Sequence, residues 1–239
     1  PTLKHVRRKE LPSGERARED MYTGMDRDIE PGVWKRYWGS KKKGTAADLR
    51  GITADTVASL PPEELDSLRK LINCVTKSGK NFEAWYEEGL VPVPKEEGNA
   101  SLHKTRPLKL VAILRKAYYG IMKDRMEKVW EDHQMLETEQ TAFAKGGSTM
   151  IPVMMFLLAV EVAEREKMEV AVSAQDISKA YDSVHYWMGK EVTLRRLAVP
   201  EWFIELEADL DRFNRNVVIT GYGIGEGELR NHADGVPEG

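Results

Sequence analysis

An acidic residue stands where an apolar stretch of this chain ends, and this limits what the stretch can be. Small and β-branched residues occupy positions 170–174, a pattern typical of a buried strand, and Asp176 follows them. A carboxylate at the end of a buried strand is costly unless a positive group meets it. A bound divalent cation and a Lys or Arg side chain are the two possible partners, and a helix cap is the structural alternative.

Composition narrows the class of protein without deciding it. The net charge of −3 gives no overall basic character, but residues 1–50 hold thirteen Lys/Arg against eight Asp/Glu, and residues 101–130 hold eight against two. Such local excesses attract phosphates, although solvated helix faces give the same counts. Cys74 is the sole cysteine, so an internal disulfide is excluded.

The longest apolar run, residues 151–163 with interruptions, is too short to span a bilayer, and no secretory signal is present. We therefore expect no membrane partner. We also expect both ends of the chain to be cuts within a longer protein.

Helical and extended patterns alternate along the chain and predict the α+β class. Residues 1–40 are polar and broken by Pro and Gly, which predicts a poorly ordered lead-in. Trp34 and Trp38 within it flank basic residues and are either a stacking patch or, more often, anchors of a tail. Helical spacing predicts helices that begin at Pro62, near residue 110, after Thr149, near residue 186 and at Pro200, and a strand-like hairpin follows from residue 216.

The helix after Thr149 is apolar nearly all round up to Val162, which predicts burial against a sheet. Upstream, residues 91–98 and 104–110 are two extended pieces joined by a polar loop, which indicates a hairpin. Lys95 and Arg106 lie on it and can project from one surface. A Lys supplies a point charge and an Arg a planar fork for phosphate oxygens, whereas a solvated surface hairpin is the structural alternative.

Five short motifs occur in a fixed order and together resemble the motif set of reverse transcriptases. The similarity is greatest to those of non-LTR retrotransposons and group II intron-like elements, and it spans about residues 41–239. The motifs are Val93-Pro94-Lys95, Arg106-Pro107-Leu108, Gln140-Thr141-Ala142-Phe143, Asp176-Ile177-Ser178-Lys179-Ala180-Tyr181-Asp182-Ser183-Val184 and Gly235-Val236-Pro237-Glu238-Gly239.

This resemblance implies an RNA-directed DNA polymerase that uses two divalent cations about 4 Å apart. Asp176 would be the catalytic metal ligand, with the Ile177 carbonyl as a second contact, and Mg²⁺ would be the ion, with Mn²⁺ as the alternative. Lys95 and Arg106 would neutralise the triphosphate of a deoxynucleotide. Tyr181, at the family's aromatic position, would pack under the deoxyribose and exclude a 2′-hydroxyl by steric contact.

The template-binding residues implied by the resemblance are Gln140, Phe143, Gly235 and Gly239. Two departures bear on them. Ala142 stands where the family has Gly, which changes the loop's backbone freedom beside Gln140. Glu238 stands where the family has Gln, which puts a negative charge near the phosphates.

The resemblance also implies a domain plan, partners and a limit. Residues 41–168 would be a fingers-like region and residues 169–239 the N-terminal part of the palm of a right-hand polymerase, truncated before the second catalytic motif. The partners would be an RNA or DNA template with its primer and deoxynucleoside triphosphates. A retroelement product of this kind would be intracellular, in the cytoplasm or the nucleus. Residues 185–239 supply no aromatic-x-Asp-Asp hairpin, since Asp209 and Asp211 fall on a predicted helix, so the fragment is expected to be inactive alone.

Two other functions remain open on the sequence. The chain could belong to a decayed retroelement and retain only nucleic-acid binding. It could also be a phosphotransferase with Asp176 as its nucleophile, but this chemistry normally requires another acid two residues on, where Ser178 stands.

Overall fold

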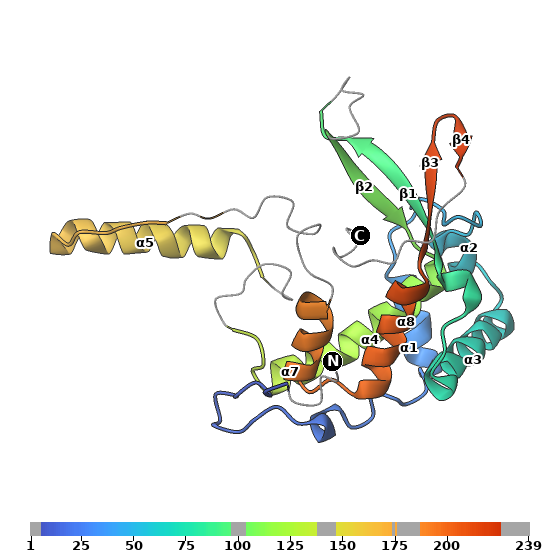
Figure 1. The fold of residues 1–239 in the computed structure, drawn as a ribbon, viewed down its shortest axis with the longest axis horizontal. Helices are drawn as coiled ribbons and strands as arrows, with labels where there is room; N and C mark the ends of the chain where they lie inside the picture. The colour runs from blue at the N-terminus through green and yellow to red at the C-terminus, as the bar shows by residue number, and fades with distance from the viewer. Residues whose placement is uncertain (1–5, 97–103, 138–146, 174, 176–186, 226–239) are drawn as a thin grey trace.

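A computed structural model describes residues 6–96, 104–137, 147–173, 175 and 187–225 of this chain. Helices of the N-terminal half pack with the C-terminal helix α8 (Glu201–Phe213), and a four-stranded mixed sheet rises from this helical body (Figure 1). The structure is therefore mixed α and β. The polymerase fold and the domain plan stay predictions.

The helical body forms around α3 (Pro62–Ser78) and α4 (Ile113–Asp132). Pro62 suits the first turn of α3 because its missing N–H has no partner there, and Gly79 ends the helix with a positive φ of 63°. Apolar side chains at helical spacing face inward from both helices. The buried ones are Ile72, Val75, Ala117, Tyr118, Ile121, Met122 and Met126. These two predicted helices are confirmed.

The N-terminal segment is packed, which differs from the predicted poorly ordered lead-in. It contains η1 (Glu19–Tyr22) and α1 (Pro31–Gly39), and Ile29, Trp34 and Trp38 belong to the core. The Ile29 N–H donates to Asn73 Oδ1 at 2.8 Å, and Arg125 donates to the Met25 and Arg27 carbonyls. Apolar burial and satisfied backbone groups thus order residues whose composition alone suggested a tail. The tryptophans are anchors.

Two short helices complete the connections, one between α1 and α3 and one between α3 and the sheet. They are α2 (Ala54–Ala58), which Thr53 caps through its side chain, and η2 (Glu83–Trp85). Trp85 is buried against Tyr118 of α4, with 5.8 Å between ring centroids. This contact fixes where the chain leaves the helical body and enters the sheet.

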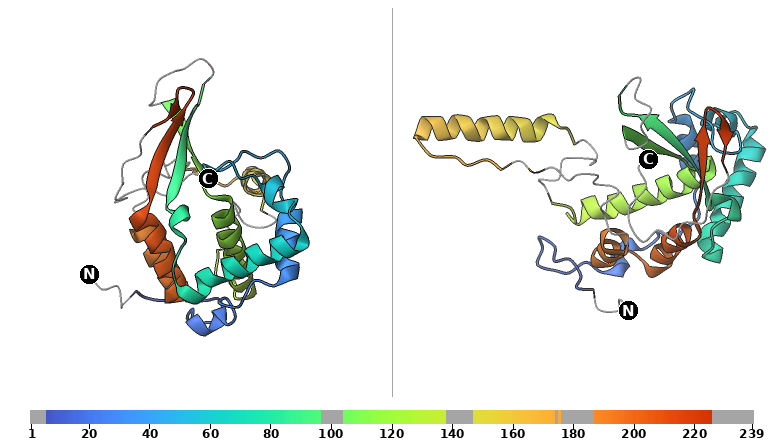
Figure 2. Two further views of the ribbon diagram at one scale, coloured as in Figure 1. Left: turned by 90° about the vertical axis from the view of Figure 1, so that its right-hand side faces the viewer. Right: turned by 45° about the horizontal axis from the view of Figure 1, so that its top comes forward.

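The sheet has the strand order β2-β1-β3-β4. β1 (Glu87–Pro94) and β2 (Thr105–Leu110) pair antiparallel, as the sequence predicted. β3 (Arg215–Thr220) joins the other side of β1 in parallel and forms a hairpin with β4 (Gly223–Ile224). The β1–β3 pairing ends at Leu90 and Val218, so beyond that point β1 and β2 continue as a two-stranded arm (Figures 1 and 2).

Proline positions explain why the arm stays two-stranded. Pro92 lies opposite Pro107, and neither residue has an N–H to give the ladder. The pair therefore occupies a non-hydrogen-bonded position, which agrees with the Lys95 N–H donating to the Lys104 carbonyl at 2.8 Å three residues further on. The missing N–H groups face outward on both edges. A third strand gains little there, and no strand of the described residues pairs with this part of the arm.

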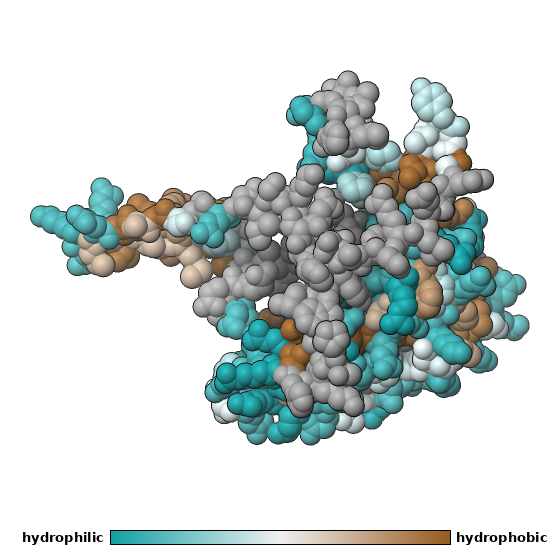
Figure 3. All heavy atoms as spheres, viewed as in Figure 1, coloured by the Kyte–Doolittle hydropathy of each residue, from teal (hydrophilic) through white to brown (hydrophobic). Residues whose placement is uncertain are grey.

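Helix α5 (Met150–Glu166) contradicts the prediction of burial against a sheet. It extends away from the helical body in two views (Figures 1 and 2), and its apolar residues dominate its surface in Figure 3. Met155 is 61% exposed and Leu157 58% exposed. An apolar helix is buried only if another segment supplies the opposing face, and no described segment does so. Among the described residues, no helix meets the length and hydropathy required of a membrane span.

The chain after α5 also differs from expectation. Residues 170–173 form no strand, and Val170 and Val172 are exposed, because no described backbone pairs with them. Further on, the predicted helix over 186–198 is present as the π-helical η4 (Trp187–Val192) and the short α7 (Thr193–Arg196). The predicted helix from Pro200 is α8, with Phe203, Leu206 and Leu210 buried. The helical spacing from Pro200 also predicts that Phe213 faces inward, but this side chain is 46% exposed.

Candidate functional site

The candidate site is the arm formed by β1 and β2, which carries cations at its tip and at its base. Arg106 on β2 lies opposite Val93, and Lys95 comes two residues after Val93. Side chains of residues i and i+2, and of directly opposed residues, share one face of a β-ladder. The register therefore puts Lys95 and Arg106 on the same face, as the sequence predicted.

The tip cations are exposed and carry no neutralising partner in the described part of the chain. Both Lys95 and Arg106 are exposed, and no described carboxylate lies within 4.0 Å of either cationic group. Their neighbour Lys104 differs, since it forms an ion pair with Glu96 at 3.2 Å. Two unneutralised cations on one face of a protruding arm are suited to an anion with several phosphates.

At the base of the arm the arrangement is reversed, because a buried carboxylate binds the cations. Glu88 of β1 is 0% exposed, and its two oxygens accept from Lys109 Nζ at 2.8 Å and from an Arg115 guanidinium nitrogen at 2.5 Å. The Asn214 side-chain amide donates to the same carboxylate at 3.0 Å. Arg115 also donates to the Trp85 carbonyl at 2.9 Å. We call these four side chains, Glu88, Lys109, Arg115 and Asn214, the Glu88 cluster.

Electrostatics keep the Glu88 carboxylate ionised despite its burial. Burial by itself raises the pKa of Glu88, but Arg115 and Lys109 together outweigh this and hold the pKa below its ordinary value. The cluster joins β1, β2, α4 and the residue between α8 and β3. It therefore fixes the arm to the helical body and has a structural role.

Sequence reasoning missed the Glu88 cluster. Glu87 and Glu88 are adjacent acids at the start of an extended segment, and strand alternation says that one of them faces inward. Only the pairing with β3 and the packing of α4 decide which one. Glu87, on the other face, forms a half-exposed pair with Arg50 at 2.8 Å.

Of the nine predicted site residues, the structure brings together Lys95 and Arg106. The others lie outside the described residues: Gln140, Phe143, Asp176, Ile177, Tyr181, Gly235 and Gly239. Their predicted roles stay predictions. Within the described ranges, no group of three or more His, Cys, Asp or Glu side chains could hold a metal ion. Asp211 on α8 instead pairs with Lys190 at 2.8 Å.

The described residues thus form a mixed α/β structure with a cationic arm. Comparison with known proteins adds an evolutionary relation. The chain is similar to the "Retrovirus-related Pol polyprotein from type-1 retrotransposable element R2" of Nasonia vitripennis. It is 23% identical to that protein over 144 residues, which are 60% of this chain and 13% of that protein. No family model matches the chain. The similarity supports a retroelement-related origin.

Proposed function

We propose that this chain is the fingers and the beginning of the palm of an RNA-directed DNA polymerase encoded by a retroelement. The observation that carries the proposal is the β1–β2 arm, which presents Lys95 and Arg106 on one face. The similarity to a retrotransposon Pol polyprotein supports it independently. The activity belongs to the complete protein, in which this chain would be one part.

Each predicted site residue has a defined task in this proposal. Lys95 and Arg106 bind the triphosphate of the incoming deoxynucleotide, where the planar Arg fork engages two oxygens and the Lys adds a point charge. Tyr181 excludes a ribose 2′-hydroxyl by contact with the sugar. The template is contacted by Gln140, Phe143, Gly235 and Gly239.

The donor groups proposed for the metal site suit Mg²⁺. The Asp176 carboxylate and the Ile177 carbonyl are oxygen ligands, which this hard cation prefers. When bound, a pair of such ions supplies activation of the primer 3′-hydroxyl and stabilisation of the leaving pyrophosphate. In this chain Asp176 is the one acid that matches a metal-binding position of the resembled family. We therefore expect the 239-residue chain alone not to extend primers.

Primer extension on an RNA template with Mg²⁺ tests the proposal in the complete retroelement protein. Asp176→Ala is expected to abolish extension, because the metal loses a ligand, while Asp132→Ala, at the exposed end of α4, leaves it unchanged. Extension by Asp176→Ala at the parent's rate would contradict the metal assignment. A complete protein that binds template and primer but never extends them would indicate a decayed remnant.

A further inference from the structure

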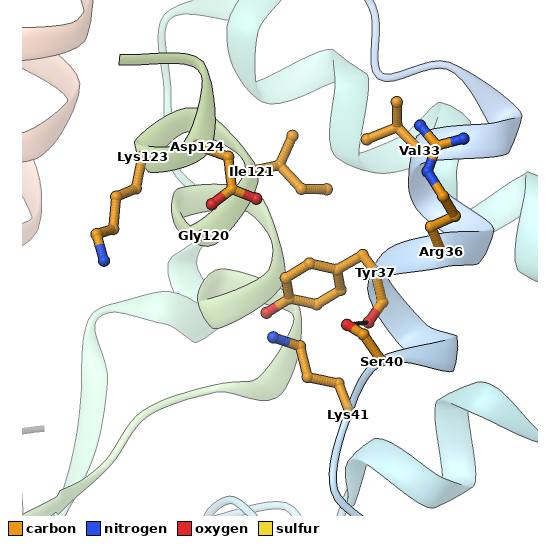
Figure 4. A pocket seen from close by; sticks show the side chains of 9 residues that line it. All are labelled: Val33, Arg36, Tyr37, Ser40, Lys41, Gly120, Ile121, Lys123 and Asp124. Atoms are coloured by element: carbon orange, nitrogen blue, oxygen red, sulfur yellow. Dashed lines mark hydrogen bonds between the residues drawn. The ribbon is translucent and has the colours of Figure 1, made fainter. Parts of the chain in front are cut away.

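A cavity between α1 and α4 lies apart from the arm and has no part in the proposed polymerase chemistry. Its volume is about 490 Å³, within the range of small-ligand sites. The side chains used below are Arg36, Tyr37, Lys41, Lys123 and Asp124, and Gly120 also lines the cavity (Figure 4). Arg36 and Tyr37 belong to α1, Lys41 follows it, and the other three belong to α4.

The cavity carries an excess of positive charge. Arg36, Lys41 and Lys123 line it against one acid, Asp124. Lys123 pairs with Glu127 at 3.2 Å, but no described carboxylate lies within 4.0 Å of the Arg36 or Lys41 cation. Lys42 and Lys43 extend the same loop and are exposed. Unneutralised cations that line a cavity favour an anionic ligand.

Tyr37 holds the Lys41 side chain in position at the cavity. The Lys41 ammonium lies 3.7 Å from the centre of the Tyr37 ring, and Figure 4 shows the two side chains next to each other. The ring is fixed because its hydroxyl donates to the Lys116 carbonyl at 3.1 Å. Gly120 leaves room for the ring, since a Cβ there would lie 3.2 Å from it, a tight contact. Lys41 is thus held at the cavity before any ligand arrives.

Burial also changes the pKa values of two side chains at the cavity. It lowers the pKa of Lys41, although Asp124 opposes this change. It also raises the pKa of Tyr37 to about 12, so the ring stays neutral. A phosphate beside Lys41 would stabilise the charged form of this exposed side chain.

We propose that this cavity binds one nucleotide unit of a single nucleic-acid strand, with backbone phosphates of the strand on Arg36 and Lys41. The volume admits one unpaired sugar and base, whereas a base in a duplex would first have to leave its stack. The inference rests on the proposed function only in that the protein meets nucleic acid. It assigns a strand contact on helices that the deoxynucleotide site does not use.

Binding of a fluorescein-labelled oligothymidylate to the 239-residue chain, measured by anisotropy without metal or deoxynucleotide, tests this. Arg36→Gln with Lys41→Gln is expected to weaken binding at least about fivefold and to reduce the salt dependence by about 0.7 per lost phosphate contact. Lys35→Gln with Lys128→Gln removes the same charge from α1 and α4, the helices that border the cavity, at positions outside it, and is expected to change binding less than twofold.

A second variant pair moves in the opposite direction. Asp124→Asn removes the acid of the cavity and is expected to tighten binding about twofold or more, whereas Asp132→Asn on the same helix is not. Circular dichroism checks that all variants are folded. Equal effects of cavity and control variants would overturn the proposal, as would the absence of oligothymidylate binding by the parent chain.

Two further binding measurements define the ligand. A duplex is expected to show no more sensitivity to the cavity variants than to the control pair, and equal losses for duplex and single strand would overturn the assignment. Thymidine monophosphate is expected to compete weakly, and competition as strong as that of the oligonucleotide would contradict strand binding. Failure of Asp176 or Arg106 variants in primer extension would affect the polymerase proposal alone, and failure of the cavity variants would affect this inference alone.

Discussion

The base and the tip of the β1–β2 arm contain the same kinds of charged side chain in opposite settings. At the base, Lys109 and Arg115 bind the buried Glu88 carboxylate. At the tip, Lys95 and Arg106 are exposed, with no described carboxylate within 4.0 Å. A paired, buried cation contributes to the fold, whereas an exposed and unneutralised one is available for a ligand. The comparison assigns structure to the base and binding to the tip.

The largest expected effect is at the base. Glu88→Gln leaves Lys109 and Arg115 without a countercharge in a buried site, so it should lower the free energy of unfolding by about 3–5 kcal/mol. Urea unfolding measures this. Glu87→Gln is the matched control on the same strand, because its pair with Arg50 is half exposed and should be worth less than about 1 kcal/mol. Equal losses in the two variants would remove the distinction between buried and exposed charges.

The pH dependence of stability tests whether the buried Glu88 stabilises the fold as an ionised carboxylate. The pKa of Glu88 is lowered from 4.5 in the folded protein, mainly by Arg115 and Lys109 acting against burial. Its contribution to stability is therefore complete above pH 4.5 and is lost as the pH falls through the folded-state pKa. Unfolding at a series of pH values should show the parent and Glu88→Gln converging in acid. A difference that grows below pH 4.5 would show that Glu88 is protonated on folding.

A pair of lysine variants compares base and tip directly. Lys109→Gln removes one of two cations from the cluster while Arg115 remains, so a smaller loss of about 1–3 kcal/mol is expected. Lys95→Gln should change the free energy of unfolding by no more than about 0.5 kcal/mol, because its side chain is exposed. Thermal or urea unfolding of both variants measures the contrast. A loss at Lys95 as large as that at Lys109 would mean that the tip, too, is structural.

Local parts of the fold could be predicted from the sequence. Helical spacing indicated α3, α4 and α8, and Pro62 indicated where α3 begins. The hairpin of β1 and β2 followed from two extended pieces joined by a short polar loop. These elements depend on residues close together in the chain, whose propensities and spacing are visible in the sequence.

The features that the sequence did not predict depend on contacts between residues that are far apart in the chain. The parallel pairing of β1 with β3 joins Glu88 to Asn216, and no local pattern encodes this contact. The Glu88 cluster depends on the same pairing. Burial of α5 was inferred from composition alone, yet burial requires an opposing surface, and none lies in the described residues. The register of Lys95 and Arg106 could be predicted because a hairpin is local, whereas the sequence left open whether Trp34 and Trp38 were anchors or a stacking patch.

The central claim is that the tip of the arm binds the deoxynucleotide triphosphate. Steady-state primer extension by the complete protein on an RNA template, with Arg106→Gln and the parent compared over a range of deoxynucleotide concentrations, tests it most directly. The variant should raise KM for the deoxynucleotide about tenfold or more, since a charge-assisted contact to the triphosphate is lost, with an unchanged melting temperature. An unchanged KM, or a KM change that accompanies a lower melting temperature, would contradict the claim.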